Sequence, residues 1–307
     1  YVLDYESLFR NAVIDDFADS YLRGETPIPC VRCNQTVKFQ DLLKTAKDLG
    51  ADALCTGHYV KRVVGSQGTE LHCGEDPTKD QSYFLFATTQ EQLEYLRFPL
   101  GHLSKDETRA HAARFKLDVA EKPDSQDICF VPDGRYSDVV KRLRPGAIDP
   151  GKIVHIDGSV LGDHDGIINF TIGQRKGLGI GGRVAAESIG ESPPLYVLEL
   201  DPTQKTVIVG PKSALARDTV LVNQINWIGA NSPLTDSLDV LVKLRSTQEP
   251  VHGTLCRANN EEGRLVLKQK QFGISSGQAA VFYSAKNRSR VFGGGWIVGT
   301  ELTDKIQ

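Results

Sequence analysis

The side chains best suited to chemistry in this sequence belong to cysteines, of which there are six. Cys30 and Cys33 form a C-x-x-C pair, and two thiols at this spacing can hold one metal ion or take part in disulfide exchange. Neither a second C-x-x-C pair nor a Cys/His pair with ligand spacing accompanies them, which leaves half of a zinc knuckle as an alternative. The pair indicates metal or redox chemistry without deciding between the two.

Cys129 is the third candidate. It follows the polar stretch Pro123–Asp127 and stands between Ile128 and Phe130. A cysteine between two large apolar residues is more often a buried small side chain than a reactive one. The polar stretch argues against that interpretation here. We expect residues 128–131 to form a strand, with Cys129 at its edge.

Two helices are expected around the C-x-x-C pair. Apolar side chains recur at a spacing of four from Asn11 to Arg23 and again from Val37 to Leu49, which is the period of an amphipathic helix. Pro27 and Pro29 disfavour helix between these segments. We therefore predict a loop from Glu25 to Asn34 that carries both cysteines.

Strand signals alternate with these helices. Ala53–Thr56 is a short apolar strand, and a hairpin is expected between Tyr59 and Cys73. Ser104 and Glu107 have the spacing of a capping box and predict a helix that begins there. Helices alternating with strands indicate an α/β layer with a parallel sheet.

The pattern changes near Pro145. The following residues are rich in glycine and in alternating apolar positions, with few helix signals. We expect a small β-rich domain over residues 146–212 and a compact β-barrel over residues 213–307. Residues 1–145 then form the α/β domain. The sequence opens on Tyr1 and contains no Met, so we expect that an N-terminal part of this domain is missing.

Composition narrows the class of protein. A chain of 307 residues with 40% hydrophobic and 24% charged residues is typical of a globular protein with two or three domains. No apolar run approaches the roughly 20 residues that span a bilayer, and no signal peptide is evident, so we expect a cytoplasmic protein without membrane contacts. The net charge of −3 argues against a generally basic nucleic-acid binder and leaves room for a local basic face.

A glycine-rich segment suggests a dinucleotide site, but its context argues against one. Gly177–Gly182 fits G-x-G-x-x-G, yet Ser188–Pro194 interrupts any helix that should follow. Arg175 and Lys176, just before the glycines, suit a contact with a phosphate backbone better. His58 is best interpreted as a hydrogen-bonded structural histidine.

Six segments resemble, in order, the signatures of the tRNA-specific 2-thiouridylases, the MnmA/TrmU family. They are PIPCVRCNQTVKF (27–39), ALCTGHYV (53–60), DPTKDQSYFLF (76–86), KPDSQDICFV (122–131), FTIGQRKGLGIGG (170–182) and FGGGWI (292–297). Their order across nearly the whole chain makes the resemblance specific, although no single motif would.

The resemblance implies a fold of three parts. A PP-loop ATP-pyrophosphatase domain of the adenine nucleotide alpha hydrolase type precedes a small central domain and a tRNA-contacting β-barrel. The Ser-Gly-Gly-x-Asp-Ser loop that binds ATP phosphates in this family is absent from the sequence. This agrees with the expectation that residues 1–145 are the C-terminal part of that domain.

The implied activity is that of a tRNA-uridine 2-sulfurtransferase. ATP, with Mg²⁺, adenylates O2 of the wobble uridine, because that oxygen leaves readily only after a phosphate is attached. A persulfide on Cys129 then supplies the sulfur, and Cys33, called the nucleophile in the family, helps to release it as a disulfide forms. A persulfide is more acidic and more nucleophilic than a thiol, which suits attack at neutral pH.

The resemblance also implies binding residues. Gly57 would lie against ATP, although an ordinary strand-to-turn glycine is equally consistent with its sequence context. The residues expected near the target base or elsewhere on tRNA are Ile28, Pro29, Cys30, Lys79, Asp80, Gln81, Arg245 and Ser246. Taken alone, Lys79 has the alternative of a solvated surface lysine.

One position departs from the family. Some members carry Asp, a proposed general acid or base, where this chain has Cys30, so that role does not transfer. Three cysteines make a [4Fe–4S] cluster held by Cys30, Cys33 and Cys129 a serious alternative to a persulfide, because three thiolates leave one iron open.

Three function classes were weighed. The leading one is the sulfurtransferase, acting on tRNA with a persulfide donor or relay protein, most simply as a monomer. The second is a non-catalytic Fe–S or metal-containing RNA-binding module, in which Cys129 would serve only as a ligand. The third is an ATP-dependent ligase with an α/β domain, which has no need of Cys129.

Overall fold

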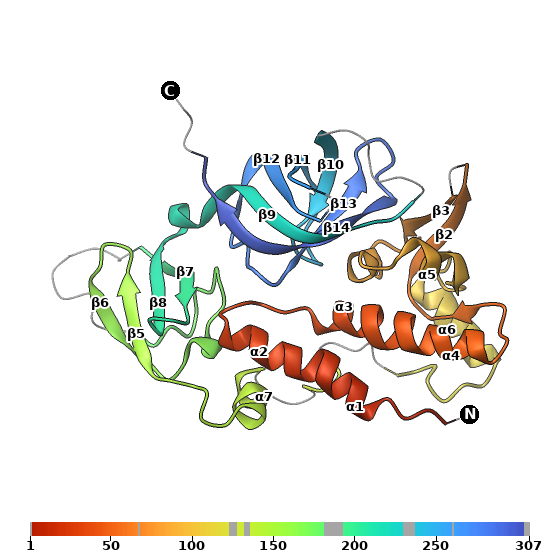
Figure 1. The fold of residues 1–307 in the computed structure, drawn as a ribbon, viewed down its shortest axis with the longest axis horizontal. Helices are drawn as coiled ribbons and strands as arrows, with labels where there is room; N and C mark the ends of the chain where they lie inside the picture. Colours follow the sequence, from red (N-terminus) through yellow and green to blue (C-terminus); the bar gives the residue numbers. More distant parts are fainter. Residues whose placement is uncertain are drawn as a thin grey trace.

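The computed structural model describes residues 2–66, 68–122, 128–131, 136–180, 193–229, 237–259 and 261–303. Helices with two short paired strands and a hairpin come first, a four-stranded sheet follows, and a β-barrel completes the fold (Figure 1). The expected succession of an α/β part, a small β-rich part and a barrel is confirmed. Parts of two sequence motifs, residues 123–127 and 181–182, lie outside the described residues, as do 188–192 of the segment after the glycines.

The first predicted helix is present and begins earlier than expected. It runs through α1 (Glu6–Phe9), the π-helical segment η1 (Arg10–Asp15) and α2 (Asp16–Leu22). Its apolar stripe is buried, with Val13 and Phe17 each 1% exposed.

The second helix corrects the expectation of a loop over residues 25–34. It begins at Pro29 and continues through α3 (Pro29–Cys33), η2 (Asn34–Leu42) and α4 (Leu43–Asp48). Pro29 occupies its first turn, where the backbone N–H that proline lacks has no helical partner in any case, and its fixed φ suits a helix start. Both cysteines of the C-x-x-C pair therefore lie on the first turn of a long helix.

The remaining elements of the first part follow the sequence signals closely. β1 (Leu54–Cys55) pairs in parallel with β4 (Leu96–Arg97), and β2 (Val60–Gly65) and β3 (Gly68–Cys73) form the predicted hairpin. The Ser104–Glu107 capping box is confirmed at the start of α6. The helical elements are η3 (Ser82–Leu85), α5 (Gln90–Tyr95), α6 (Lys105–Arg114) and α7 (Tyr136–Leu143).

Residues 128–131 form a turn, so the prediction of a strand there was wrong. The N–H of Val131 donates to the carbonyl of Ile128 at 2.9 Å. The apolar side chains of the turn pack onto α2 and α7, and the Phe130 ring meets that of Phe17 edge-to-face at 5.2 Å between centroids. This packing buries Val131 fully and Ile128 and Phe130 in part, and it leaves Cys129 exposed.

The middle part is a four-stranded sheet in the order β6 (Val160–His164), β5 (Gly151–His155), β8 (Thr206–Pro211), β7 (Leu195–Asp201). One face buries Ile153, Val197, Val207 and Val209. The short helical turns η4 (Ile167–Asn169) and η5 (Lys212–Leu215) flank it.

The barrel follows from six strands with alternating apolar residues. They are β9 (Ala216–Trp227), β10 (Ser237–Lys243), β11 (Val251–Arg257), β12 (Gly263–Phe272), β13 (Ala279–Ser284) and β14 (Arg290–Glu301). Each strand pairs with its neighbours in the order β13-β10-β11-β12-β9-β14, and pairing of β13 with β14 closes the ring. Closure leaves no unpaired edge within the ring. The predicted strands at 238–244, 264–267, 279–283 and 296–298 all belong to it.

The hairpin joins the first part to the barrel. β3 continues the barrel sheet at β14, where His72 pairs with Arg290 and Leu71 with Val291. One hydrophobic core spans both parts, and it includes Val31 and Trp296. The helix that carries the cysteines is thus fixed against the barrel.

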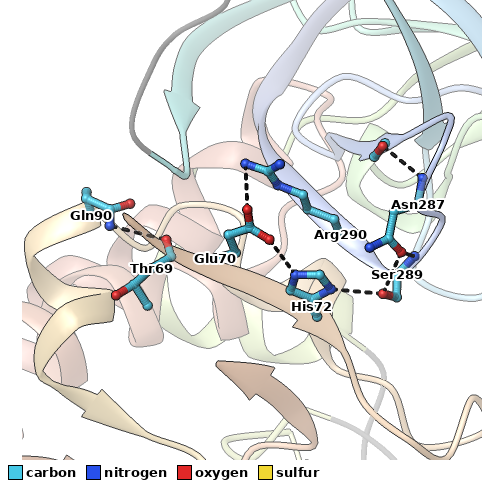
Figure 2. Close-up of polar contacts among 8 residues, drawn as sticks. Thr69, Glu70, His72, Gln90, Asn287, Ser289 and Arg290 are labelled. Atoms are coloured by element: carbon cyan, nitrogen blue, oxygen red, sulfur yellow. Dashed lines mark hydrogen bonds and ion pairs between the residues drawn. The ribbon is translucent and has the colours of Figure 1, made fainter. Parts of the chain in front are cut away.

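Figure 2 shows a polar network at this junction. The Glu70 carboxylate lies 2.9 Å from His72 Nε2 and 3.1 Å from Arg290 Nη2, and His72 Nδ1 lies 2.9 Å from Ser289 Oγ. The side chains of Glu70 and His72 are only 17% and 9% exposed. Because Glu70 contacts groups on both β3 and β14, it links the hairpin to the barrel.

No helix among the described residues is long and apolar enough to cross a membrane.

The junction yields a stability prediction. Glu70→Gln removes the charge that partners Arg290 and His72, so we expect the free energy of unfolding to fall by about 1–3 kcal/mol. The matched control is Glu75→Gln, whose carboxylate pairs with Lys61 at 3.0 Å but is 62% exposed. That change should stay within about 0.5 kcal/mol. Urea denaturation followed by tryptophan fluorescence measures both, and equal effects would show that Glu70 has no special part in the junction.

Candidate active site

A cavity of about 620 Å³ opens between the N-terminal helix, the start of the second helix, the turn at 128–131 and the barrel. Seven of the residues singled out from the sequence line it: Ile28, Pro29, Cys30, Cys33, Gln81, Cys129 and Ser246. They come from segments as far apart as 28 and 246 in the chain. The fold therefore gathers most of the expected site in one place.

Cys33 and Cys129 face the same cavity as thiols. Burial raises the pKa of the Cys33 thiol, the Lys38 ammonium lowers it, and the charge of the Cys129 thiolate raises it. Cys129 itself is exposed, as is Cys30. The two thiols therefore lie on one cavity, with Cys129 exposed and Cys33 half-buried.

The three cysteines do not fit a metal site in this arrangement. Among the described residues, no group of three or more His, Cys, Asp or Glu side chains is placed to hold a metal ion. A [4Fe–4S] cluster on Cys30, Cys33 and Cys129 stays a prediction, and we derive no step through it.

Gly57 is not among the residues that line this cavity, and its role in ATP binding stays a prediction. It is exposed, and a Cβ at this position would meet only the Leu100 side chain at 3.6 Å, which is ordinary contact. The described fold does not itself require glycine here.

The three residues of the Lys79-Asp80-Gln81 segment differ in position, because only Gln81 lines the cavity. The Gln81 Oε1 accepts from the Tyr59 N–H at 2.9 Å and lies 3.3 Å from His58 Nδ1, so the side chain is held at the cavity wall. Lys79 does not line the cavity.

Asp80 is turned into the protein. Its carboxylate accepts from the N–H of Gly74 and from the N–H and hydroxyl of Ser82, at 2.7–3.1 Å, and its side chain is 6% exposed. This placement does not favour a contact of the Asp80 side chain with tRNA. The carboxylate instead fixes the loop that carries its two neighbours.

On the barrel side, Ser246 lines the cavity and Arg245 lies beside it. Both residues are exposed. The Arg245 Nη2 donates to the carbonyl oxygens of Phe272 and Gly273, which ties the β10–β11 loop to the end of β12.

The sequence did not identify Asn34, Lys38, Phe84 and Gln278, all of which line the cavity. The Lys38 ammonium donates to Asn34 Oδ1 at 3.1 Å. Lys38 follows Asn34 by four residues, about one helical turn, which places the two side chains next to each other on the helix. The spacing of Asn34 and Lys38 is visible in the sequence, but it indicates a shared helix face only if the helix already includes both residues.

His58 also lines the cavity and is uncharged at neutral pH. Burial, aided by the charge of Lys38, lowers its pKa to about 4, against a weaker opposing effect of the hydrogen bond with Gln81. The expected structural, hydrogen-bonded histidine is consistent with this environment.

Three family models match consecutive parts of the chain. They are described as the tRNA methyl transferase HUP domain (residues 1–133), the tRNA methyl transferase PRC-barrel domain (137–211) and the aminomethyltransferase beta-barrel domain (217–297).

Curated relatives match nearly the full chain. The chain is 60% identical over 306 residues to the tRNA-specific 2-thiouridylase MnmA of Rhodospirillum centenum, a match that covers all of the chain and 76% of that protein. The proteins of the same name from Ruegeria pomeroyi and Maricaulis maris are each 57% identical over 300 residues. These matches cover 97% and 98% of this chain, and 77% and 71% of those proteins.

The depressed pKa of His58 predicts a pH dependence. The unfolded state takes up a proton near pH 6.5 and the folded state only near pH 4. Stability is therefore full above pH 6.5 and falls as the pH drops towards 4, by up to about 3 kcal/mol. Denaturation of wild type and His58→Gln at pH 7 and pH 4.5 measures this, and the variant should lose less stability on acidification. An equal loss in both proteins would contradict the assignment.

Proposed function

The chain belongs to the family of the tRNA-specific 2-thiouridylases MnmA, and from this premise we propose that it is a tRNA-uridine 2-sulfurtransferase that makes 2-thiouridine at the wobble position. The observation that carries the proposal is the joint placement of Cys33 and Cys129 on one cavity. Sulfur transfer needs two thiols within reach of each other and of a substrate base, and an ATP-dependent ligase does not.

The proposed reaction divides the work between the two cysteines. The uridine O2 attacks the α-phosphorus of ATP and pyrophosphate leaves, so that the attached AMP turns O2 into a leaving group. The outer sulfur of a Cys129 persulfide attacks C2, and the C2–O bond breaks with its electron pair going to AMP. The Cys33 thiolate then attacks the Cys129 sulfur, the S–S bond breaks, and sulfur stays on C2 while a Cys33–Cys129 disulfide forms. A dithiol reductant restores both thiols.

The environment of each cysteine supports this order. Cys129 is exposed on a turn, where a protein donor can reach it to load a persulfide. Cys33 is half-buried near the start of the second helix, and burial raises the pKa of its thiol. A shielded second thiol limits early disulfide formation.

Binding roles follow from position. We propose that Ile28, Pro29, Cys30 and Gln81 surround the target base, since they line the cavity, and that Ser246, Arg245 and Lys79 contact tRNA around its rim. Gly57 would admit ATP, with Mg²⁺ neutralising its phosphates. The donor would be a persulfide-carrying protein, and the enzyme would act as a monomer in the cytoplasm. We propose domain boundaries after residues 145 and 212.

The decisive experiment measures the product. Nucleosides of tRNA from a strain that lacks the gene should contain no 2-thiouridine by mass spectrometry, and the wild-type gene should restore it. Cys33→Ser and Cys129→Ser should each lower the product by at least about 10³-fold, since each removes a reacting atom. Cys256→Ser is the matched control, because Cys256 lies on β11 of the barrel and should leave the product unchanged. Unaltered 2-thiouridine in the deletion strain would refute the proposed function.

Cys30→Ser separates the persulfide from the cluster. If two thiols suffice, this variant keeps most of the activity, whereas loss of one of three cluster ligands would be as damaging as Cys33→Ser. Iron and labile sulfide should be assayed on anaerobically purified protein beside the activity. We expect an iron-free, active preparation when a persulfide donor is supplied. Activity that depends on bound iron would reverse this conclusion.

A further inference from the structure

Few charged side chains line the cavity within the described part of the chain. Among the described residues that line it there is no Asp and no Glu, and His58 is neutral because its pKa is about 4. The other titratable side chains that face the cavity are the thiols and two phenols: Cys30, Cys33, Cys129, Tyr83 and Tyr136. Lys38 is therefore the one described lining residue with a formal charge at neutral pH.

The Lys38 ammonium is held in place. Its Nζ donates to Asn34 Oδ1 at 3.1 Å, and the Asn34 amide nitrogen donates to the carbonyl of Phe84 at 3.2 Å. Asn34 is only 4% exposed, so it provides a rigid support. One ammonium proton is used in this contact, which leaves two donors for a ligand.

A comparison within the same helix shows that this arrangement is unusual. Lys44 pairs with Asp48 at 2.6 Å and Lys47 pairs with Glu91 at 2.7 Å, so both carry a neutralising carboxylate. Lys38 has no carboxylate partner within the part of the chain that the structure describes; its printed contact is with the neutral Asn34. Lys38 is exposed as a residue, and its ammonium at the cavity wall is tied to the buried amide of Asn34.

We propose that Lys38 is the anion-binding group of the cavity and that it holds the phosphate of the adenylated base. This inference rests on the proposed function. When C2–O breaks, the electron pair goes to the phosphate oxygen, and the phosphate changes from a diester with one negative charge to a monoester with two. An ammonium aimed at that oxygen binds the product charge more strongly than the starting charge, which favours the transfer.

The test compares two alkylating reagents at one thiol. Iodoacetate is an anion and iodoacetamide is neutral, and both alkylate a cysteine only in its thiolate form, so the exposed Cys30 and Cys129 are replaced by Ser in every protein compared. The degree of ionisation of Cys33 therefore cancels in the ratio of their rates, which reports the local charge. Mass spectrometry of the Cys33 peptide gives both rates at pH 8 and low ionic strength.

We expect the ratio of the iodoacetate rate to the iodoacetamide rate at Cys33 to be at least about threefold lower in Lys38→Met than in wild type. In Lys38→Arg, which keeps the charge, the ratio should be close to the wild-type value. Lys44→Met, on the same helix, should leave the ratio unchanged. An unchanged ratio in Lys38→Met, or an equal fall in Lys44→Met, would overturn the proposal. Circular dichroism checks that each variant is folded.

A second arm identifies the anion. Millimolar inorganic phosphate should slow the reaction of wild type with iodoacetate more than chloride of equal ionic strength does, and this difference should vanish in Lys38→Met. If phosphate is no more effective than chloride, the assignment to phosphate is wrong. Neither arm requires tRNA thiolation. A protein that passes both and makes no 2-thiouridine would refute the proposed function and leave the anion site standing.

Discussion

The structure depends on one packing constraint, the burial of the first turn of α3 against the barrel. Val31 is fully buried in a core shared with β13 and β14, and the Arg32 guanidinium stacks on the Trp296 ring at 4.3 Å. These contacts fix the rotation of the helix about its axis. Residues 30 and 33, on the other face, must then point into the cavity. The reactive turn is thus positioned by residues that take no part in the chemistry.

The burial of this turn also explains which charged side chains face the cavity. A helix held in one rotation keeps Cys30, Cys33 and Lys38 on one face, and the apolar turn at 128–131 closes the space opposite. The carboxylate of Asp80, next to Gln81 at the cavity wall, is turned into the protein. The described lining therefore mixes apolar and neutral polar side chains with one cation, Lys38, and in a partly enclosed space charge–charge interactions are stronger than in water. We propose that this environment stabilises both anions of the reaction, the AMP leaving group and the attacking sulfur.

Much of this could be predicted from the sequence, and the failures have physical causes. Local rules worked where the cause is local: the capping box at Ser104, the β2–β3 hairpin and the alternating barrel strands. The helix start at Pro29 was missed because proline was taken as a barrier, whereas at a first turn it is favourable. The inward Asp80 depends on Gly74 and Ser82, which the sequence alone does not place around it. Domain boundaries and most individual site roles stay predictions.

The central claim is that Cys33 and Cys129 are the pair that reacts. Mild oxidation of the thiol protein with diamide, followed by proteolysis and mass spectrometry under non-reducing conditions, tests it without substrate or donor. The account predicts a Cys33–Cys129 disulfide as the dominant bond, formed equally well in Cys30→Ser. A dominant Cys30–Cys33 bond, or a Cys129 that stays reduced throughout, would contradict it.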